Sequence, residues 1–186
     1  MIRKLTVALA VLLLAGISPA EEQKPELKPV ASFVHPDAAG KLPILGTVAV
    51  VLSGIDPQAN RLLEDALALG VLSESIRVIY PGEKELGKNR QSPPEPVEFA
   101  RKLGANSLIT GNIIARCGHC VRSGGRCSAE EMRAVSLALV DVPQDKVLVW
   151  ALYEPESGTP VTAISQAFVR FMIESLKEQK KEGEQK

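Results

Sequence analysis

Three cysteines stand close together at Cys117, Cys120 and Cys127, and the chain has no others. The first two belong to a Cys-Gly-His-Cys segment that includes His119. Cysteine thiolates at such spacings can form a disulfide, bind a metal ion or exchange disulfides with another protein. The stretch from residue 117 to residue 127 is therefore the strongest candidate for chemistry in the sequence.

Four states of these sulfurs are open. A disulfide would staple the loop in an oxidising compartment. A metal site would use Cys117, Cys120 and Cys127 with His119 or the distant His35, but no second Cys-x-x-Cys is present. The segment also matches the tetrapeptide of disulfide isomerases, although no helix is indicated there to lower a thiol pKa. Inert reduced thiols are the fourth state. We favour a disulfide from Cys127 to Cys117 or Cys120, because a loop between adjacent strands brings its ends together.

Other catalytic signals are weak. The chain has two histidines, His119 in the cysteine loop and His35 in a polar, proline-rich stretch. Acidic neighbours such as Glu64 and Asp65 are predicted to lie on solvated helix faces. Asp141 fits a turn cap, and Trp150 fits a core or sheet-face position. We therefore predict that the chain is not an enzyme and holds no cofactor.

The first twenty residues have the layout of a secretory signal peptide. Arg3 and Lys4 precede an apolar run over residues 5–17, and Ser18 and Ala20 are the small residues of a cleavage site. The run is shorter than the roughly 20 residues that span a bilayer, and no later segment is long and apolar enough. We predict cleavage after Ala20 and a periplasmic location.

The formal net charge of the whole chain is zero, and cleavage would remove two positive charges. A near-neutral domain has no electrostatic basis for binding nucleic acid. Behind the signal we predict a Pro-rich polar arm over residues 21–44, a single α/β domain over residues 45–178 and a charged tail over residues 179–186. We expect the arm to be a tether or loosely docked, because it offers little to bury.

Alternating apolar patterns predict five strands and three helices. The first helix begins at Pro57 and is expected to stop at Gly70, with an apolar face that includes Leu62, Leu63 and Leu67. Helical connections make the first three strands parallel, and short connections make the fourth antiparallel. Apolar runs on both strand faces predict a mixed sheet with helices on both sides. The expected strands are residues 47–52, 76–80, 107–115, 133–141 and 146–153.

Three sequence segments resemble those of a known group of proteins: residues 48–51, residues 98–111 and residues 137–150. They are similar to the bacterial envelope domains around the TolB N-terminal domain, the curli secretion protein CsgG and the penicillin-binding-protein activator LpoB. The resemblance implies a three-layer fold with strand order 2-1-3-4-5 and strand four antiparallel. It also implies interaction with another envelope protein or self-association. The cysteine loop supplies the alternative, a metal-binding or thiol-redox protein that uses Cys117, Cys120, Cys127 and His119.

Overall fold

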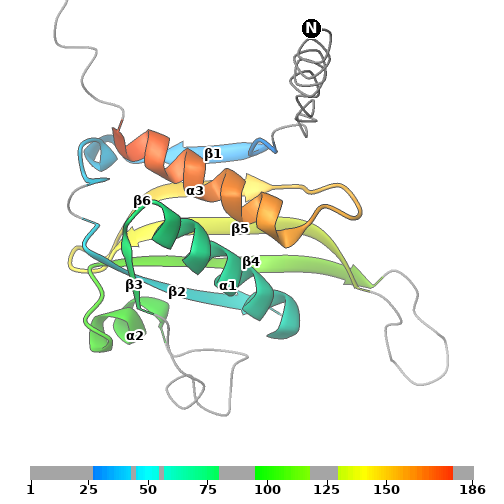
Figure 1. Ribbon diagram of the computed structural model, residues 1–186, viewed down its shortest axis with the longest axis horizontal. Helices are drawn as coiled ribbons and strands as arrows, with labels where there is room; N and C mark the ends of the chain where they lie inside the picture. Colours follow the sequence, from blue (N-terminus) through cyan, green and yellow to red (C-terminus); the bar gives the residue numbers. More distant parts are fainter. Residues whose placement is uncertain (1–26, 43–44, 55–56, 80–94, 118–129, 178–186) are drawn as a thin grey trace, which may run out of the picture.

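The computed structural model describes residues 27–42, 45–54, 57–79, 95–117 and 130–177. They form one mixed sheet with helices packed on it (Figure 1). The elements in chain order are β1 (Ala31–Val34), the short 3-10 helix η1 (Pro36–Ala38), β2 (Thr47–Gly54), α1 (Pro57–Ser73), β3 (Arg77–Ile79), α2 (Pro96–Lys102), β4 (Ser107–Cys117), β5 (Glu130–Asp141), β6 (Lys146–Tyr153) and α3 (Val161–Lys177). The predicted signal peptide and the predicted tail over residues 179–186 lie outside the described residues.

The sheet has six strands in the order β1-β6-β5-β4-β2-β3. Strands β2, β3 and β4 are parallel, and β5 is antiparallel to both β4 and β6. The prediction of five strands is therefore wrong in number, and the strand order of the whole sheet differs from the predicted one, because β1 adds an edge beside β6. The five predicted strands keep their predicted neighbours, and the antiparallel fourth strand is present.

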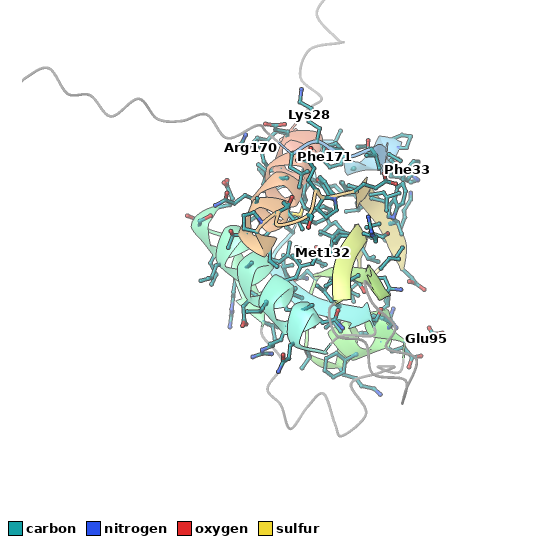
Figure 2. All side chains as sticks on the ribbon, turned by 90° about the vertical axis from the view of Figure 1, so that its right-hand side faces the viewer. Lys28, Phe33, Glu95, Met132, Arg170 and Phe171 are labelled. Atoms are coloured by element: carbon teal, nitrogen blue, oxygen red, sulfur yellow. The ribbon has the colours of Figure 1, made fainter. Side chains whose placement is uncertain are left out.

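Helices cover both faces of the sheet, but unequally. Helices α1 and α3 lie side by side on one face, as the edge-on view of Figure 2 shows. On the other face the described residues hold one helix, α2, which has only seven residues. It packs beside β2 and β4, where its Ala100 is fully buried against Ala49, Val51 and Leu108. Most of that second face has no helical layer in the part of the chain that the structure describes.

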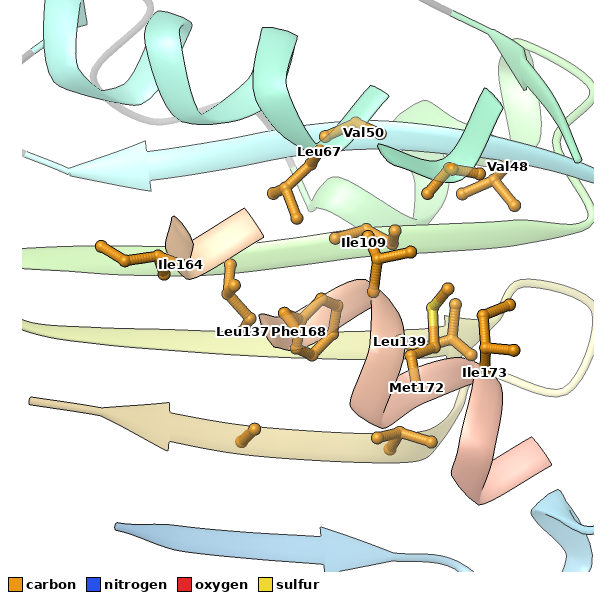
Figure 3. Close-up of a cluster of buried hydrophobic side chains, with 14 of the residues drawn as sticks. Val48, Val50, Leu67, Ile109, Leu137, Leu139, Ile164, Phe168, Met172 and Ile173 are labelled. Atoms are coloured by element: carbon orange, nitrogen blue, oxygen red, sulfur yellow. The ribbon is translucent and has the colours of Figure 1, made fainter. Parts of the chain in front are cut away.

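The main core lies between the sheet and the two long helices (Figure 3). Alternate residues of the strands point into it, as the two-residue repeat of a strand requires. Helix α3 contributes its predicted apolar stripe, in which Ile164, Phe168, Met172 and Leu176 are fully buried. Burial of large aliphatic and aromatic side chains of this kind is the main source of folding free energy.

The arm predicted over residues 21–44 contributes structure to the sheet. Strand β1 pairs with β6 along its whole length, and Ala38 of η1 is fully buried in the main core. The backbone N–H of Gly40 donates to the carbonyl of Leu176 at 2.9 Å. The expectation of a loosely docked tether is therefore wrong for residues 31–42. Strand β1 lies at the edge of the sheet, and its four residues are all exposed. Its sequence therefore lacks the alternation of apolar and polar residues from which a strand is predicted.

Helix α1 is longer than predicted, and the face that it buries differs from the predicted one. It passes through Gly70 and continues to Ser73, and Ser75 then adopts a positive φ of 61°. Gly70 faces α3, where an added Cβ would lie 3.1 Å from the Cγ2 atom of Val169. This glycine permits close helix packing and does not end the helix.

Candidate functional site

The cysteine segment joins two paired strands, as predicted. Cys117 is the last residue of β4, and its Cα partner in β5 is Glu130. His119, Cys120 and Cys127 lie outside the described residues, so their arrangement remains a prediction. Within the described ranges no group of three or more His, Cys, Asp or Glu residues could hold a metal ion.

His35 occupies a defined position beside the sheet. Its backbone N–H donates to the carbonyl of Leu148 at 2.8 Å, and its Nδ1 accepts from the backbone N–H of Asp37 at 3.0 Å. The ring meets Phe33 edge-on, with 6.1 Å between ring centroids. Because Nδ1 accepts a hydrogen bond, the neutral ring carries its proton on Nε2. These contacts give His35 the role of an N-cap of η1.

Two ion pairs hold η1 and the following residues against the β5–β6 turn. Lys41 Nζ lies 3.0 Å from Asp141 Oδ2, and Lys146 contacts the carboxylate of Asp37. The hydrogen bond from Lys146 and its charge lower the pKa of Asp37. Asp141 also accepts from the backbone N–H of Gln144 at 3.2 Å, which confirms the predicted turn cap.

A small cavity opens beside the Lys41–Asp141 pair, between Leu45, Asn106 and Leu148. Its volume is about 50 Å³. Pockets for small organic ligands usually enclose several hundred Å³. The cavity has room for a water molecule or two and does not provide a substrate site.

Three leucines of α1 point outward and form what we name the leucine stripe: Leu62, Leu69 and Leu72. Their exposed fractions are 61%, 67% and 51%. Leu62 and Leu69 are seven residues apart, and Leu72 follows three residues later, so all three lie on one side of the helix. Leu62 was predicted to lie on the buried face of the helix, and this prediction is wrong.

Two polar residues of α1 belong to its buried face, which therefore differs from the predicted apolar face. Asn60 and Glu64 are buried together with Leu63 and Leu67 on the side that faces the sheet. Glu64 Oε1 accepts a hydrogen bond from the backbone N–H of Leu52 at 2.9 Å. The prediction of a solvated Glu64 is therefore wrong. A buried helix face made of residues 60, 63, 64, 67 and 71 also has helical spacing, and it would have left the leucine stripe exposed. The sequence does not favour this face, because it includes the carboxylate of Glu64, and a buried carboxylate is rare without a partner.

Helix α3 shows what an ordinary solvated face looks like in this molecule. It has the same length as α1 and covers the same face of the sheet. Its exposed positions are all polar or charged: Thr162, Gln166, Arg170, Glu174 and Lys177. The apolar character of the leucine stripe is thus specific to α1 and marks a candidate interaction surface.

A second apolar surface lies on the opposite side of the sheet, and we name it the open sheet face. It comprises Phe33, Ile114, Val147, Trp150 and Leu152. The pairing of Phe33 with Trp150 and of Val147 with Val140 places these side chains on the face that also carries α2. In Figure 2 Phe33 lies on the side of the sheet away from α1 and α3.

The open sheet face is partly accessible. Phe33, Ile114 and Val147 are 48%, 52% and 40% exposed, and Trp150 is half-buried. The indole Nε1 of Trp150 donates to Ser136 Oγ at 2.8 Å, which fixes the ring against β5 and confirms the predicted sheet-face position. A fixed aromatic side chain beside other apolar groups is a frequent feature of protein interfaces.

Comparisons with known proteins identify the fold. No family model and no curated protein matches the sequence. A PelC dodecamer from Paraburkholderia phytofirmans matches with a TM-score of 0.50 and 18% identity, over 80% of this chain and 97% of that one. The lipoprotein GNA1162 from Neisseria meningitidis matches with a TM-score of 0.46 and 12% identity, over 69% of this chain and 99% of that one.

Two members of the group named in the sequence analysis are also among the structural matches. TolB from Acinetobacter baumannii has a TM-score of 0.37 and 17% identity, over 66% of this chain and 28% of that one. The LpoB C-terminal domain from Salmonella enterica has a TM-score of 0.37 and 14% identity, over 61% of this chain and 84% of that one. The expected resemblance to TolB and LpoB is thereby confirmed as a likeness of fold.

Proposed function

We propose that this chain is a non-enzymatic interaction or assembly module of the bacterial cell envelope, located in the periplasm. The observation that supports this proposal best is the leucine stripe. Exposed apolar side chains at helical spacing have an unfavourable free energy in water, and association with another protein removes them from it. The polar outer face of α3 indicates that the fold itself does not require this exposure.

The predicted signal peptide and the fold support the location. In the part of the chain that the structure describes, no helix has the length and apolarity needed to cross a membrane. The structural match to a protein that forms dodecamers makes self-association the first form of assembly to test. A likeness of fold is compatible with many functions, so the interaction surface must be tested on this chain.

A photo-reactive amino acid placed at position 69 tests the proposal in cells. We expect covalent adducts from position 69, in the middle of the leucine stripe, and none from position 166 on the polar face of α3. Both positions are solvent-exposed and lie on helices of the same length. Equal adducts from the two positions, or none from position 69, would contradict an interface on α1.

The alternative function is a metal-binding or thiol-redox protein built on Cys117, Cys120, Cys127 and His119. The pairing of Cys117 with Glu130 favours a bridge across the loop, because Cys127 is three residues from Glu130 in sequence. We propose a disulfide from Cys127 to Cys117 or Cys120. Peptide mapping after thiol blocking tests it, and a Cys117–Cys120 bond or stoichiometric bound metal would support the alternative instead.

A further inference from the structure

The imidazole of His35 meets Asp37 in two ways. Its Nδ1 accepts a hydrogen bond from the backbone N–H of Asp37 at 3.0 Å, and the same nitrogen lies 3.7 Å from Oδ2 of the Asp37 carboxylate. The first contact requires a bare Nδ1, whereas the second becomes a charge-assisted hydrogen bond only when Nδ1 carries a proton. The neutral and the protonated ring therefore favour different partner atoms on one residue.

We propose that His35 is a proton-operated switch that changes the partner of Asp37. When the ring is neutral, Nδ1 caps η1 and the Asp37 carboxylate holds Lys146 of β6. When Nδ1 takes up a proton from the solvent, it no longer accepts from the backbone N–H of Asp37 and donates to Oδ2 instead, where it competes with Lys146. This inference concerns a part of the fold outside the leucine stripe and does not depend on the proposed function.

The charged groups around the ring allow both states. The Asp37 carboxylate of η1 is the acid next to the ring, and Lys146 of β6 contacts the same Oδ2 atom. Lys41 follows η1 and is held by Asp141 at the end of β5, with 3.0 Å between Nζ and Oδ2. Lysine side chains stay charged over the range of about pH 5 to 8 in which imidazole side chains change charge. Among these described groups, the proton on His35 is therefore the one that solvent pH controls in this range.

The switch acts on the segment that closes one edge of the sheet. His35 directly follows β1, and its backbone N–H donates to the carbonyl of Leu148 in β6 at 2.8 Å. Its own carbonyl accepts from the backbone N–H of Ala38, which is buried in the main core. The ring and the Asp37 carboxylate both reach solvent, so protonation buries no new charge. We therefore expect a local opening of η1 in acid, and not unfolding of the domain.

The chain supplies a matched pair of variants, because His35 and His119 are its only histidines. His35→Asn keeps an acceptor, since Oδ1 of asparagine is as many bonds from Cβ as Nδ1 of histidine, but it does not titrate. His119→Asn removes the other imidazole and leaves His35 in place. Each variant and the wild-type chain are followed by NMR and by amide hydrogen exchange between pH 8 and pH 5.

In the wild type and in His119→Asn we expect the amide signal of Asp37 to move with the same midpoint as the ring signals of His35. The protection of this amide, corrected for the intrinsic effect of pH on exchange, should fall about fivefold to tenfold, as the loss of one hydrogen bond predicts. In His35→Asn the signal and the protection should stay constant over this range.

An Asp37 amide that does not follow the His35 ring in the wild-type chain would overturn the switch. The same change of the amide in His35→Asn would assign it to another group and would overturn the switch as well. If His35→Asn does not fold, the wild-type titration still decides, because two different midpoints for the ring and the amide would separate the two events.

Discussion

Glu64 carries a buried carboxylate whose Oε1 accepts from the backbone N–H of Leu52 at the end of β2. Glu64→Ala would leave this N–H without its partner, so we expect a loss of about 1–3 kcal/mol in the free energy of unfolding. Glu64→Gln keeps an acceptor oxygen and should lose less. Urea denaturation measures both, with exposed Asp65→Ala as the control at the neighbouring position. A loss for Asp65→Ala as large as that for Glu64→Ala would contradict the specific role of Glu64.

The contact between Asp37 and Lys146 should make stability depend on pH in the acid range. The pKa of Asp37 is lower in the folded chain than its ordinary value, chiefly because Lys146 donates a hydrogen bond to it. A group with a lowered folded pKa stabilises the fold above its unfolded pKa, and this contribution is lost as the pH falls below about 4. We expect the difference in melting temperature between wild type and Asp37→Asn to shrink between pH 6 and pH 3. A difference that stays constant would show that the Asp37 charge contributes nothing.

Single residues were predicted from the sequence where local chemistry decides their role. Asp141 caps its turn because a short side chain can reach the backbone N–H three residues ahead. The burial of Glu64 could not be predicted in the same way, because its hydrogen-bond donor, the backbone N–H of Leu52, belongs to β2, although Arg61 of α1 also lies 3.9 Å from its Oε2. Leu62 was assigned to the buried face because the expected apolar face did not include Asn60 and Glu64, which are buried beside Leu63 and Leu67.

The segment that contains β1 and η1 is expected to contribute to the stability of the domain. Removal of residues 21–42 would break the pairing of β1 with β6, expose core now covered by Ala38 and Leu42, and remove the Lys41–Asp141 ion pair. We expect the melting temperature to fall by more than about 5 °C, which corresponds to one or two kcal/mol in a domain of this size. Melting within a degree or two of the chain that keeps residues 21–42 would support the loosely docked arm that the sequence predicted.

Gly111 lies where β4 and β5 approach each other too closely for a side chain. A Cβ there would lie 2.1 Å from the backbone oxygen of Ser136. Gly111→Ala must therefore displace β5, and we expect a loss of about 2–3 kcal/mol in the free energy of unfolding. Exposed Asn112→Ala, at the next position of β4, should change it by less than about 0.5 kcal/mol. Chemical denaturation of both variants decides between strand displacement and a general intolerance of β4 to substitution.

Elements with a strong apolar pattern were predicted well, and elements that depend on tertiary contacts were not. Strand β6 has the predicted bounds, and the buried stripe of α3 was identified from its spacing. Strand β1 has four exposed residues, so no burial pattern could indicate it. The continuation of α1 through Gly70 depends on α3 packing against it, which local propensity does not report.

At the scale of the whole molecule, the five predicted strands have the expected neighbours because the connections restrict the topology strongly. The surplus apolar surface was not visible in the sequence. Leu62 was counted toward the core, and Leu69 and Leu72 were not assigned to either face, because the core positions of α1 are known only once the strands beneath it have been placed. The two surfaces on opposite sides of the sheet are thus a property of the assembled domain.

The exposure of the leucine stripe has a genetic consequence under the proposed function. Position 69 is more than half exposed, so Leu69→Glu leaves the core intact and should cost less than about 0.5 kcal/mol in the free energy of unfolding. We therefore expect this variant to lose its function in cells while its melting temperature stays within about two degrees of the wild type. Gln166→Glu, on the polar face of α3, is the matched control and should keep both. A fully functional Leu69→Glu chain would show that the stripe is not needed for interaction.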